Sequence, residues 1–299
     1  MVPVRPVGEE LRSSGATATL GDYLDLTKAR LSLTVVASGV VGYWLGASFI
    51  EPAHLLWFTL GTLLLVAGAN AFNQVLEREP DARMRRTAQR PIPARRLSVA
   101  DAALAAGLAS VLGLVLLFAE SGPLSGGLGA LALAIYVLVY TPMKRRSSWS
   151  TLPGAISGAL PTLMGYAAAA GTLSPRAWCL FGILFFWQFP HTWAIAATYR
   201  EDFERVGNRA LPRCAVAAGT MAATAALLLT SLLPSLWGAA GPLYTAGALV
   251  LGTGFLVSAA RFGNGTRRAR ATVLLATSLV YLPLMLALVA FGALGVRGF

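Results

Sequence analysis

The chain is organised around the stretch that begins with residues 70–81, Asn70-Ala71-Phe72-Asn73-Gln74-Val75-Leu76-Glu77-Arg78-Glu79-Pro80-Asp81. It closes an apolar run that begins near Leu55 and is long enough to cross a bilayer. Asn73, Glu77 and Asp81 follow one another at intervals of four, so they share one face of a continuous helix. The end of a membrane span therefore carries a row of oxygen ligands.

Seven arginines follow these ligands, between Arg78 and Arg96. Hard oxygen ligands beside cations suit a Mg²⁺-bound phosphate group. The alternative is a solvated helix end whose carboxylates pair with nearby arginines. Asn70, inside the apolar run, favours a functional site, because a polar group at membrane depth is costly unless it faces a cavity or a partner. We also expect Pro80 to break or kink the helix just before Asp81.

The composition indicates a membrane protein. The chain is 56% hydrophobic and 12% charged, whereas soluble domains are about one-quarter charged. Its apolar runs are continuous rather than alternating, which predicts an all-α protein and not a barrel. We expect residues 1–20 to form a flexible cytoplasmic tail and residues 21–299 a single transmembrane domain. Nine spans are expected, near residues 31–50, 54–76, 98–118, 123–141, 152–171, 176–198, 214–234, 241–260 and 271–293.

The distribution of positive charge gives an orientation. With nine spans, 22 of the 24 lysines and arginines lie on the side of the N-terminus. The positive-inside rule then predicts a cytoplasmic N-terminus, cytoplasmic polar loops and an outside C-terminus. The net charge of +11 could suggest nucleic acid, but the cations lie in short loops between spans, so no nucleic acid partner is expected. Cys179 and Cys214 form no disulfide or zinc pattern.

A second polar cluster comprises Trp187-Gln188-Phe189-Pro190-His191 and Tyr199-Arg200-Glu201-Asp202. His191 and Asp202 are eleven residues apart, which is three helical turns, so they lie on one face. Asp202 is a second candidate for a hard ligand, and the alternative is a charged helix cap. His191 is either a chemical participant or a buried imidazole bonded to a neighbouring backbone group. The layout repeats that of the first cluster and indicates two half-sites that close on one ligand.

A third feature is Tyr140, which ends a span, with Lys144 four residues later. An aromatic residue at the membrane interface beside a snorkelling lysine explains most such pairs. The glycine-rich fifth span, which includes Gly158 and Gly165, predicts close helix contact or room for a bulky ligand.

Nearly the whole chain resembles the UbiA superfamily of intramembrane prenyltransferases, and within it the protohaem IX farnesyltransferases, or haem O synthases. The motifs that carry the resemblance are Leu26-Thr27-Lys28-Ala29-Arg30, Asn73 to Asp81 with Arg86 and Arg90, Tyr140-Thr-Pro-Met-Lys144-Arg145, Gly158-Ala-Leu-Pro161, Trp187-Gln-Phe-Pro-His191 and Tyr199-Arg-Glu-Asp202-Phe. The last two are particular to the haem branch. Ala29, Ser150, Thr162 and Phe203 depart from its usual pattern, and Glu77 stands where the superfamily commonly has Asp.

The resemblance implies nine transmembrane helices around a central cavity, capped by cytoplasmic helical loops. It implies transfer of the farnesyl group of farnesyl diphosphate to a vinyl group of haem B, with water addition, giving haem O and diphosphate. Mg²⁺ is the implied cofactor, and haem B is a substrate. The implied location is the bacterial cytoplasmic (inner) membrane. The lipid bilayer surrounds the protein, and a haem A synthase or another oxidase-assembly protein is a candidate partner.

The resemblance also assigns roles to residues. The implied metal ligands, catalytic together with His191, are Asn73, Glu77, Asp81 and Asp202. The implied diphosphate-binding residues are Lys28, Arg86, Arg90, Lys144, Arg145 and Arg200. Other implied substrate contacts are Asn70, Tyr140, Gln188 and Tyr199.

Two rival functions are consistent with parts of the sequence. A UbiA-type enzyme could prenylate an aromatic quinone precursor, but the motifs particular to the haem branch argue against it. A cation-coupled transporter also uses intramembrane carboxylates and helices broken by glycine or proline. Such a transporter predicts charges near the bilayer midplane, whereas Glu77, Asp81 and Asp202 are expected at one membrane face, which favours an enzyme.

Overall fold

The computed structural model describes residues 18–144, 146–207, 213–263 and 268–296, and these residues contain helices and no strand. The expected all-α class is therefore confirmed. The predicted tail lies almost wholly outside the described residues. The elements are α2 (Leu20–Leu26), α3 (Ala29–Gly46), α4 (Pro52–Leu76), α5 (Arg78–Arg83), α6 (Val99–Glu120), α7 (Gly122–Ala134), a π-helical turn η1 (Ile135–Tyr140), α8 (Thr141–Met143), a 3₁₀ turn η2 (Ser148–Ser150), α9 (Thr151–Ala170), α10 (Pro175–Thr198), α11 (Arg200–Arg205), α12 (Arg213–Leu236), α13 (Pro242–Gly263) and α14 (Arg268–Val296).

Eight of the described helical segments are long and apolar enough to cross a membrane. They are α3, α4, α6, α10, α12, α13 and α14, and the continuous segment 122–143 that joins α7, η1 and α8. The fifth expected span is α9, a helix of 20 residues that falls short of the same apolarity. The count of nine membrane crossings therefore stays a prediction.

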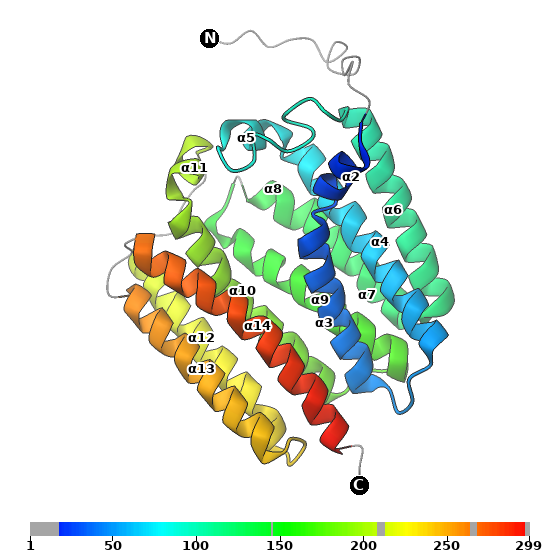
Figure 1. Ribbon diagram of the computed structural model, residues 1–299, viewed down its shortest axis with the longest axis vertical. Helices are drawn as coiled ribbons and strands as arrows, with labels where there is room; N and C mark the ends of the chain where they lie inside the picture. The colour runs from blue at the N-terminus through cyan, green and yellow to red at the C-terminus, as the bar shows by residue number, and fades with distance from the viewer. Residues whose placement is uncertain (1–17, 145, 208–212, 264–267, 297–299) are drawn as a thin grey trace.

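The glycine-rich helix α9 lies at the centre of the bundle and packs against α3, α7 and α10 (Figure 1). A Cβ on Gly165 of α9 would lie only 1.9 Å from the carbonyl oxygen of Gly39 in α3. A Cβ on Gly42 would lie 2.1 Å from the carbonyl oxygen of Thr162. Small residues thus allow the two backbones to touch, as in close membrane helix pairs.

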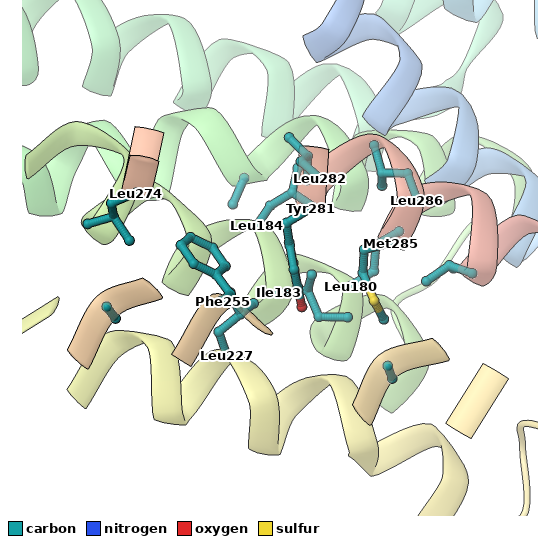
Figure 2. Close-up of a cluster of buried hydrophobic side chains, with 14 of the residues drawn as sticks. Leu180, Ile183, Leu184, Leu227, Phe255, Leu274, Tyr281, Leu282, Met285 and Leu286 are labelled. Carbon is teal, nitrogen blue, oxygen red and sulfur yellow. The ribbon is translucent and has the colours of Figure 1, made fainter. Parts of the chain in front are cut away.

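The helices α10, α12, α13 and α14 share one apolar core (Figure 2). Ile183 of α10, Leu227 of α12 and Phe255 of α13 are buried there against Tyr281 and Met285 of α14. On the other side of α9, α4 packs against α6, and α6 packs against α7. Because α14 also contacts α3 and α10, the two groups of helices close around α9.

The short helices α2, α5 and α11 gather at one end of the bundle (Figure 1). Gln74, near the end of α4, donates to the carbonyl oxygens of Asp25 and Leu26 at the end of α2, at 2.8 and 2.9 Å. Arg96, in the loop after α5, pairs with Asp22 of α2 at 2.6 Å. These contacts fix a cap over the ends of α3 and α4.

The helix break in residues 70–81 falls earlier than the sequence predicts. Glu77 takes non-helical dihedrals (φ −95°, ψ 9°) and separates α4 from α5. Pro80 lies within the first turn of α5, where a helix leaves its amide hydrogens unpaired, so the missing N–H costs nothing there. The expected break at Pro80 is therefore wrong, and the helix is interrupted at Glu77. The amides of Glu77 and Asp81 still donate to the carbonyl oxygens of Asn73 and Glu77, at 2.9 and 2.8 Å, so the four-residue spacing continues across the break.

Candidate functional site

A cavity of about 630 Å³ lies beneath the cap. On one side it is lined by apolar residues of α3 and α4, such as Val35 and Leu65. On the other side it is lined by residues of α10, α12 and α13, including His191, Val216 and Phe262. Its end toward the cap carries the charged residues of the first cluster. The cavity therefore joins a charged mouth to an apolar interior, as a prenyl diphosphate would require.

Three oxygen ligands at the mouth each lie beside a cation. Asn73 Oδ1 accepts a hydrogen bond from Lys28 Nζ at 2.8 Å. Glu77 Oε1 and Oε2 lie 2.7 and 3.0 Å from Lys144 Nζ. Asp81 Oδ2 pairs with the guanidinium of Arg90. These six side chains all line the cavity, so the structure brings together the first predicted motif and three of its predicted cations.

The charges at the mouth perturb one another. Burial alone would raise the pKa of Glu77, but the charges of Lys144, Lys28 and Arg90 outweigh it and hold that pKa below its usual range. Glu77 is therefore ionised at neutral pH, the form that binds a cation. Burial, together with the charge of Arg90, lowers the pKa of Lys28 to about 7. A bound anion beside Lys28 would therefore favour the protonated, positively charged form of this side chain.

Local backbone geometry positions these side chains. Lys28 begins α3 with a left-handed conformation (φ 50°), which is uncommon for a residue other than glycine. Asn73 Nδ2 donates to Thr141 Oγ1 at 3.1 Å, so both ends of this amide are bonded. Thr141 directly follows the π-helical turn η1, a distortion that is frequent at functional sites. In that turn, the ring centroids of Tyr136 and Tyr140 lie 5.2 Å apart.

Asp202 is buried in α11 but is not among the residues that line the cavity. Its two carboxylate oxygens accept hydrogen bonds from the backbone amides of Arg85 and Arg86, at 3.0 and 3.3 Å. Arg205 lies 3.6 Å from the same carboxylate. Asp202 therefore fastens the loop after α5 to α11, and its predicted role as a metal ligand stays a prediction.

The other predicted anion-binding residues are distributed around the cap. Arg86 lines the cavity and its guanidinium lies 5.4 Å from the centre of the Tyr199 ring. Arg200 also lines the cavity and pairs with Glu204 one turn later. Arg145 lies outside the described residues. Tyr199 itself is exposed at the junction of α10 and α11 and does not line the cavity.

Deeper in the cavity, polar side chains bond across helices. Asn70 Nδ2 donates to Ser32 Oγ at 3.1 Å, and Tyr136 Oη donates to Asn70 Oδ1 at 3.4 Å. Gln188 Nε2 donates to the carbonyl oxygen of Ala155 at 3.2 Å. Sequence reasoning missed Tyr136, although a hydroxyl inside an apolar run and one turn before Tyr140 was a usable signal.

His191 lies in the middle of α10 and lines the cavity. Its Nδ1 is 2.8 Å from Ser278 Oγ on α14, and its ring stacks on Trp187. One of the two alternatives for His191 was a bond to a backbone group, and the partner of Nδ1 is instead a side chain. Ser278 lies 87 residues away in the chain and carried no local signal.

A family model described as the UbiA prenyltransferase family matches residues 35–282. The chain belongs to this family. A protohaem IX farnesyltransferase of Solibacter usitatus is 44% identical over 280 residues, covering 88% of this chain and 96% of the relative. One from Opitutus terrae is 42% identical and covers 91% of this chain and 94% of the relative. The resemblance to the haem branch of the UbiA family is thus confirmed.

Solved structures show the same fold. A digeranylgeranylglyceryl phosphate synthase matches with a TM-score of 0.78 at 18% identity, covering 92% of this chain and 99% of that one. A UbiA homologue from Archaeoglobus fulgidus bound to GPP and Mg²⁺ matches with a TM-score of 0.63 at 17% identity, covering 90% and 99%. Together with the apolar helices, family membership makes this UbiA chain an integral membrane prenyltransferase.

Proposed function

We propose that this chain transfers the farnesyl group of farnesyl diphosphate to a vinyl group of haem B, giving haem O and diphosphate. The observation that carries the proposal is a cavity that joins the paired oxygens and cations at its mouth to an apolar interior with His191. Its relatives at 42–44% identity carry the name protohaem IX farnesyltransferase. These relatives favour haem over the aromatic quinone precursor as the acceptor.

The residues at the mouth fit a magnesium ion. Asn73, Glu77 and Asp81 offer an amide oxygen and two carboxylates on one cavity wall, which are the ligands that Mg²⁺ prefers. Bound there, Mg²⁺ would neutralise the diphosphate as it leaves. Asp202 would join this set only if its carboxylate were released from the loop amides. Among the described residues, no group of three His, Cys, Asp or Glu side chains forms a metal site without amides.

The chain's own groups would divide the reaction into two regions. Lys28, Lys144 and Arg90 would bind the phosphate oxygens and stabilise the negative charge that develops on them. The bond from the allylic carbon to oxygen breaks, and diphosphate leaves with the electron pair. Apolar residues such as Val35 and Leu65 would bind the prenyl chain and keep water from the allylic cation.

The second half of the reaction concerns the acceptor. The vinyl π-bond of haem B attacks the allylic carbon and forms the new carbon–carbon bond. A water molecule then adds to the cation next to the porphyrin and releases one proton. We propose that the protein lies in a bacterial inner membrane with its capped end toward the cytoplasm. An interaction with a haem A synthase stays a prediction.

Mass spectrometry of products tests this function. Purified protein in detergent is incubated with haem B, farnesyl diphosphate and Mg²⁺, and we expect haem O and free diphosphate. A chelator in place of Mg²⁺ should abolish both products. A prenylated aromatic acid formed from a quinone precursor, without haem O, would favour the rival enzyme. Cation flux in proteoliposomes without any product would favour the transporter.

A further inference from the structure

His191 is held in one orientation by contacts to two elements. Its Nδ1 lies 2.8 Å from Ser278 Oγ on α14. The Trp187 ring, one turn earlier on α10, stacks on the imidazole with 4.4 Å between centroids and 17° between planes. Trp187 Nε1 in turn donates to the carbonyl oxygen of Ser278 at 2.8 Å. Ser278 is fully buried on α14, so water does not compete for these contacts.

The same contacts determine the tautomer of His191. Ser278 Oγ lies 2.6 Å from the carbonyl oxygen of Leu275, a separation at which two oxygens need a proton between them. The hydroxyl has one proton, and this bond uses it. Ser278 Oγ must therefore accept from His191, which places the proton on Nδ1. The lone pair of the neutral imidazole is then on Nε2.

The remaining nitrogen, Nε2, carries a free lone pair on a residue of the cavity lining. No hydrogen-bond partner for Nε2 exists among the described residues. An imidazole with Nδ1–H bonded to a neighbour and Nε2 open is the usual arrangement of a metal-ligating histidine. In the part of the chain that the structure describes, no cluster of His, Cys, Asp and Glu accompanies it. A lone imidazole suits a metal that brings its other ligands with it, as a porphyrin iron does.

We infer that His191 Nε2 is the axial ligand to the iron of the haem substrate, and that Ser278 and Trp187 are positioning residues that hold it there. The inference rests on the proposed function, which brings haem B into this cavity. His191 lies seven residues before Thr198, the last residue of α10, so it stands about 10 Å along that helix from the cap. The porphyrin thus occupies the α10 side of the cavity and leaves the α3–α4 side for the prenyl chain.

Resonance Raman spectroscopy of bound haem B, without farnesyl diphosphate, reads the ligand directly. We expect the reduced wild-type complex to show an iron–histidine stretching band. His191→Ala should lose this band and bind haem at least about tenfold more weakly. Imidazole added to His191→Gly should restore the band. The matched control is His54→Ala, because His54 bonds to Tyr43 near the start of α4 and does not line the cavity.

Ser278→Ala separates positioning from packing. If Ser278 orients the ligand, this variant keeps the band at a shifted frequency and raises the KM for haem about tenfold, with a smaller change in kcat. A lowered melting temperature with an unshifted band would overturn the role of Ser278. An unchanged band and affinity in His191→Ala would overturn the inference as a whole.

Haem O formation, measured on the same preparations, distinguishes this inference from the proposed function. Product formed by a wild-type protein that lacks the iron–histidine band would overturn the ligand and leave the function standing. A band that depends on His191, in a protein that forms no haem O, would overturn the function and support the ligand.

Discussion

At the scale of single residues, the charge of Glu77 is set by its surroundings. Lys144 holds both carboxylate oxygens at the point where α4 turns into α5. A carboxylate in this place can bind a divalent cation and also keep Lys144 directed at the cavity. A glutamine at this position would have the same shape but no negative charge with which to bind the cation or to pair with Lys144. Glu77 is therefore the position where removal of one charge is most informative.

Glu77→Gln should lower kcat/KM for haem O formation by about 10²-fold or more, because a negatively charged ligand for the divalent cation is lost and Lys144 loses its ion-pair partner. The rate is measured at saturating haem B over a range of farnesyl diphosphate and Mg²⁺ concentrations. The control is Glu79→Gln, since Glu79 is an exposed carboxylate two residues later in α5. Equal losses in both variants would point to a general charge effect and contradict the site.

Asp202→Ala should accelerate hydrogen exchange at the amides of Arg85 and Arg86, because their acceptors are removed. Asp202→Asn keeps one side-chain acceptor and should give an intermediate rate. Exchange is followed by mass spectrometry of peptides from the loop after α5. Unchanged exchange would show that these hydrogen bonds do not hold the loop. A Mg²⁺ titration of activity in the same variants tests the ligand role, which predicts a higher half-saturating concentration.

At the scale of elements, close contact between α3 and α9 sets the shape of the cavity. Gly165→Ala would place its Cβ 1.9 Å from the Gly39 carbonyl oxygen, so the two backbones must separate. Overpacking of this kind costs about 1–3 kcal/mol, and we expect a lower midpoint of thermal unfolding in detergent. The control is Gly107→Ala in α6, where a Cβ meets nothing within 4 Å and the change should stabilise the helix by about 0.5–1 kcal/mol. Equal midpoints in the two variants would contradict the contact.

The elements could be predicted from the sequence because bilayer thickness fixes their length and apolarity. The boundaries found for α4 and α10 differ by two residues or fewer from those expected. The exact point of the break could not be predicted, because proline is tolerated in the first turn of a helix as well as after its end. The structure places the break at Glu77, three residues before the proline.

The residues of the first site were predictable for a related reason. Carboxylates at the end of an apolar run stand out, and Asn73, Glu77 and Asp81 all line the cavity. Tyr136, one turn before Tyr140, carried a usable signal that was overlooked, whereas Ser278 carried none. Their partners lie 66 and 87 residues away and become neighbours only when the bundle closes.

At the scale of the whole molecule, the two halves of the site come from opposite sides of α9. The first motif lies on and between α4 and α5, and its cations lie just before α3, in the loop after α5 and in the segment after η1. His191 and Asp202 belong to α10 and α11. The halves meet at the cavity and again in the cap, where Asp202 holds the loop after α5. The orientation of the cap therefore decides from which side of the membrane the diphosphate arrives.

The cap should face the cytoplasm, because that orientation keeps 22 of the 24 lysines and arginines inside and avoids moving a basic loop across the membrane. We test this with single cysteines in a Cys214→Ser background, since Cys214 is exposed and Cys179 is buried. Ala82→Cys lies in α5 of the cap. Thr172→Cys follows α9, about 30 Å along that helix from its start near the cap.

In sealed right-side-out vesicles, a membrane-impermeant maleimide should label Thr172→Cys and spare Ala82→Cys, and inverted vesicles should give the opposite. Labelling of Ala82→Cys from outside would reverse the predicted orientation. Labelling of both positions from the same side would exclude an odd number of membrane spans between residues 82 and 172.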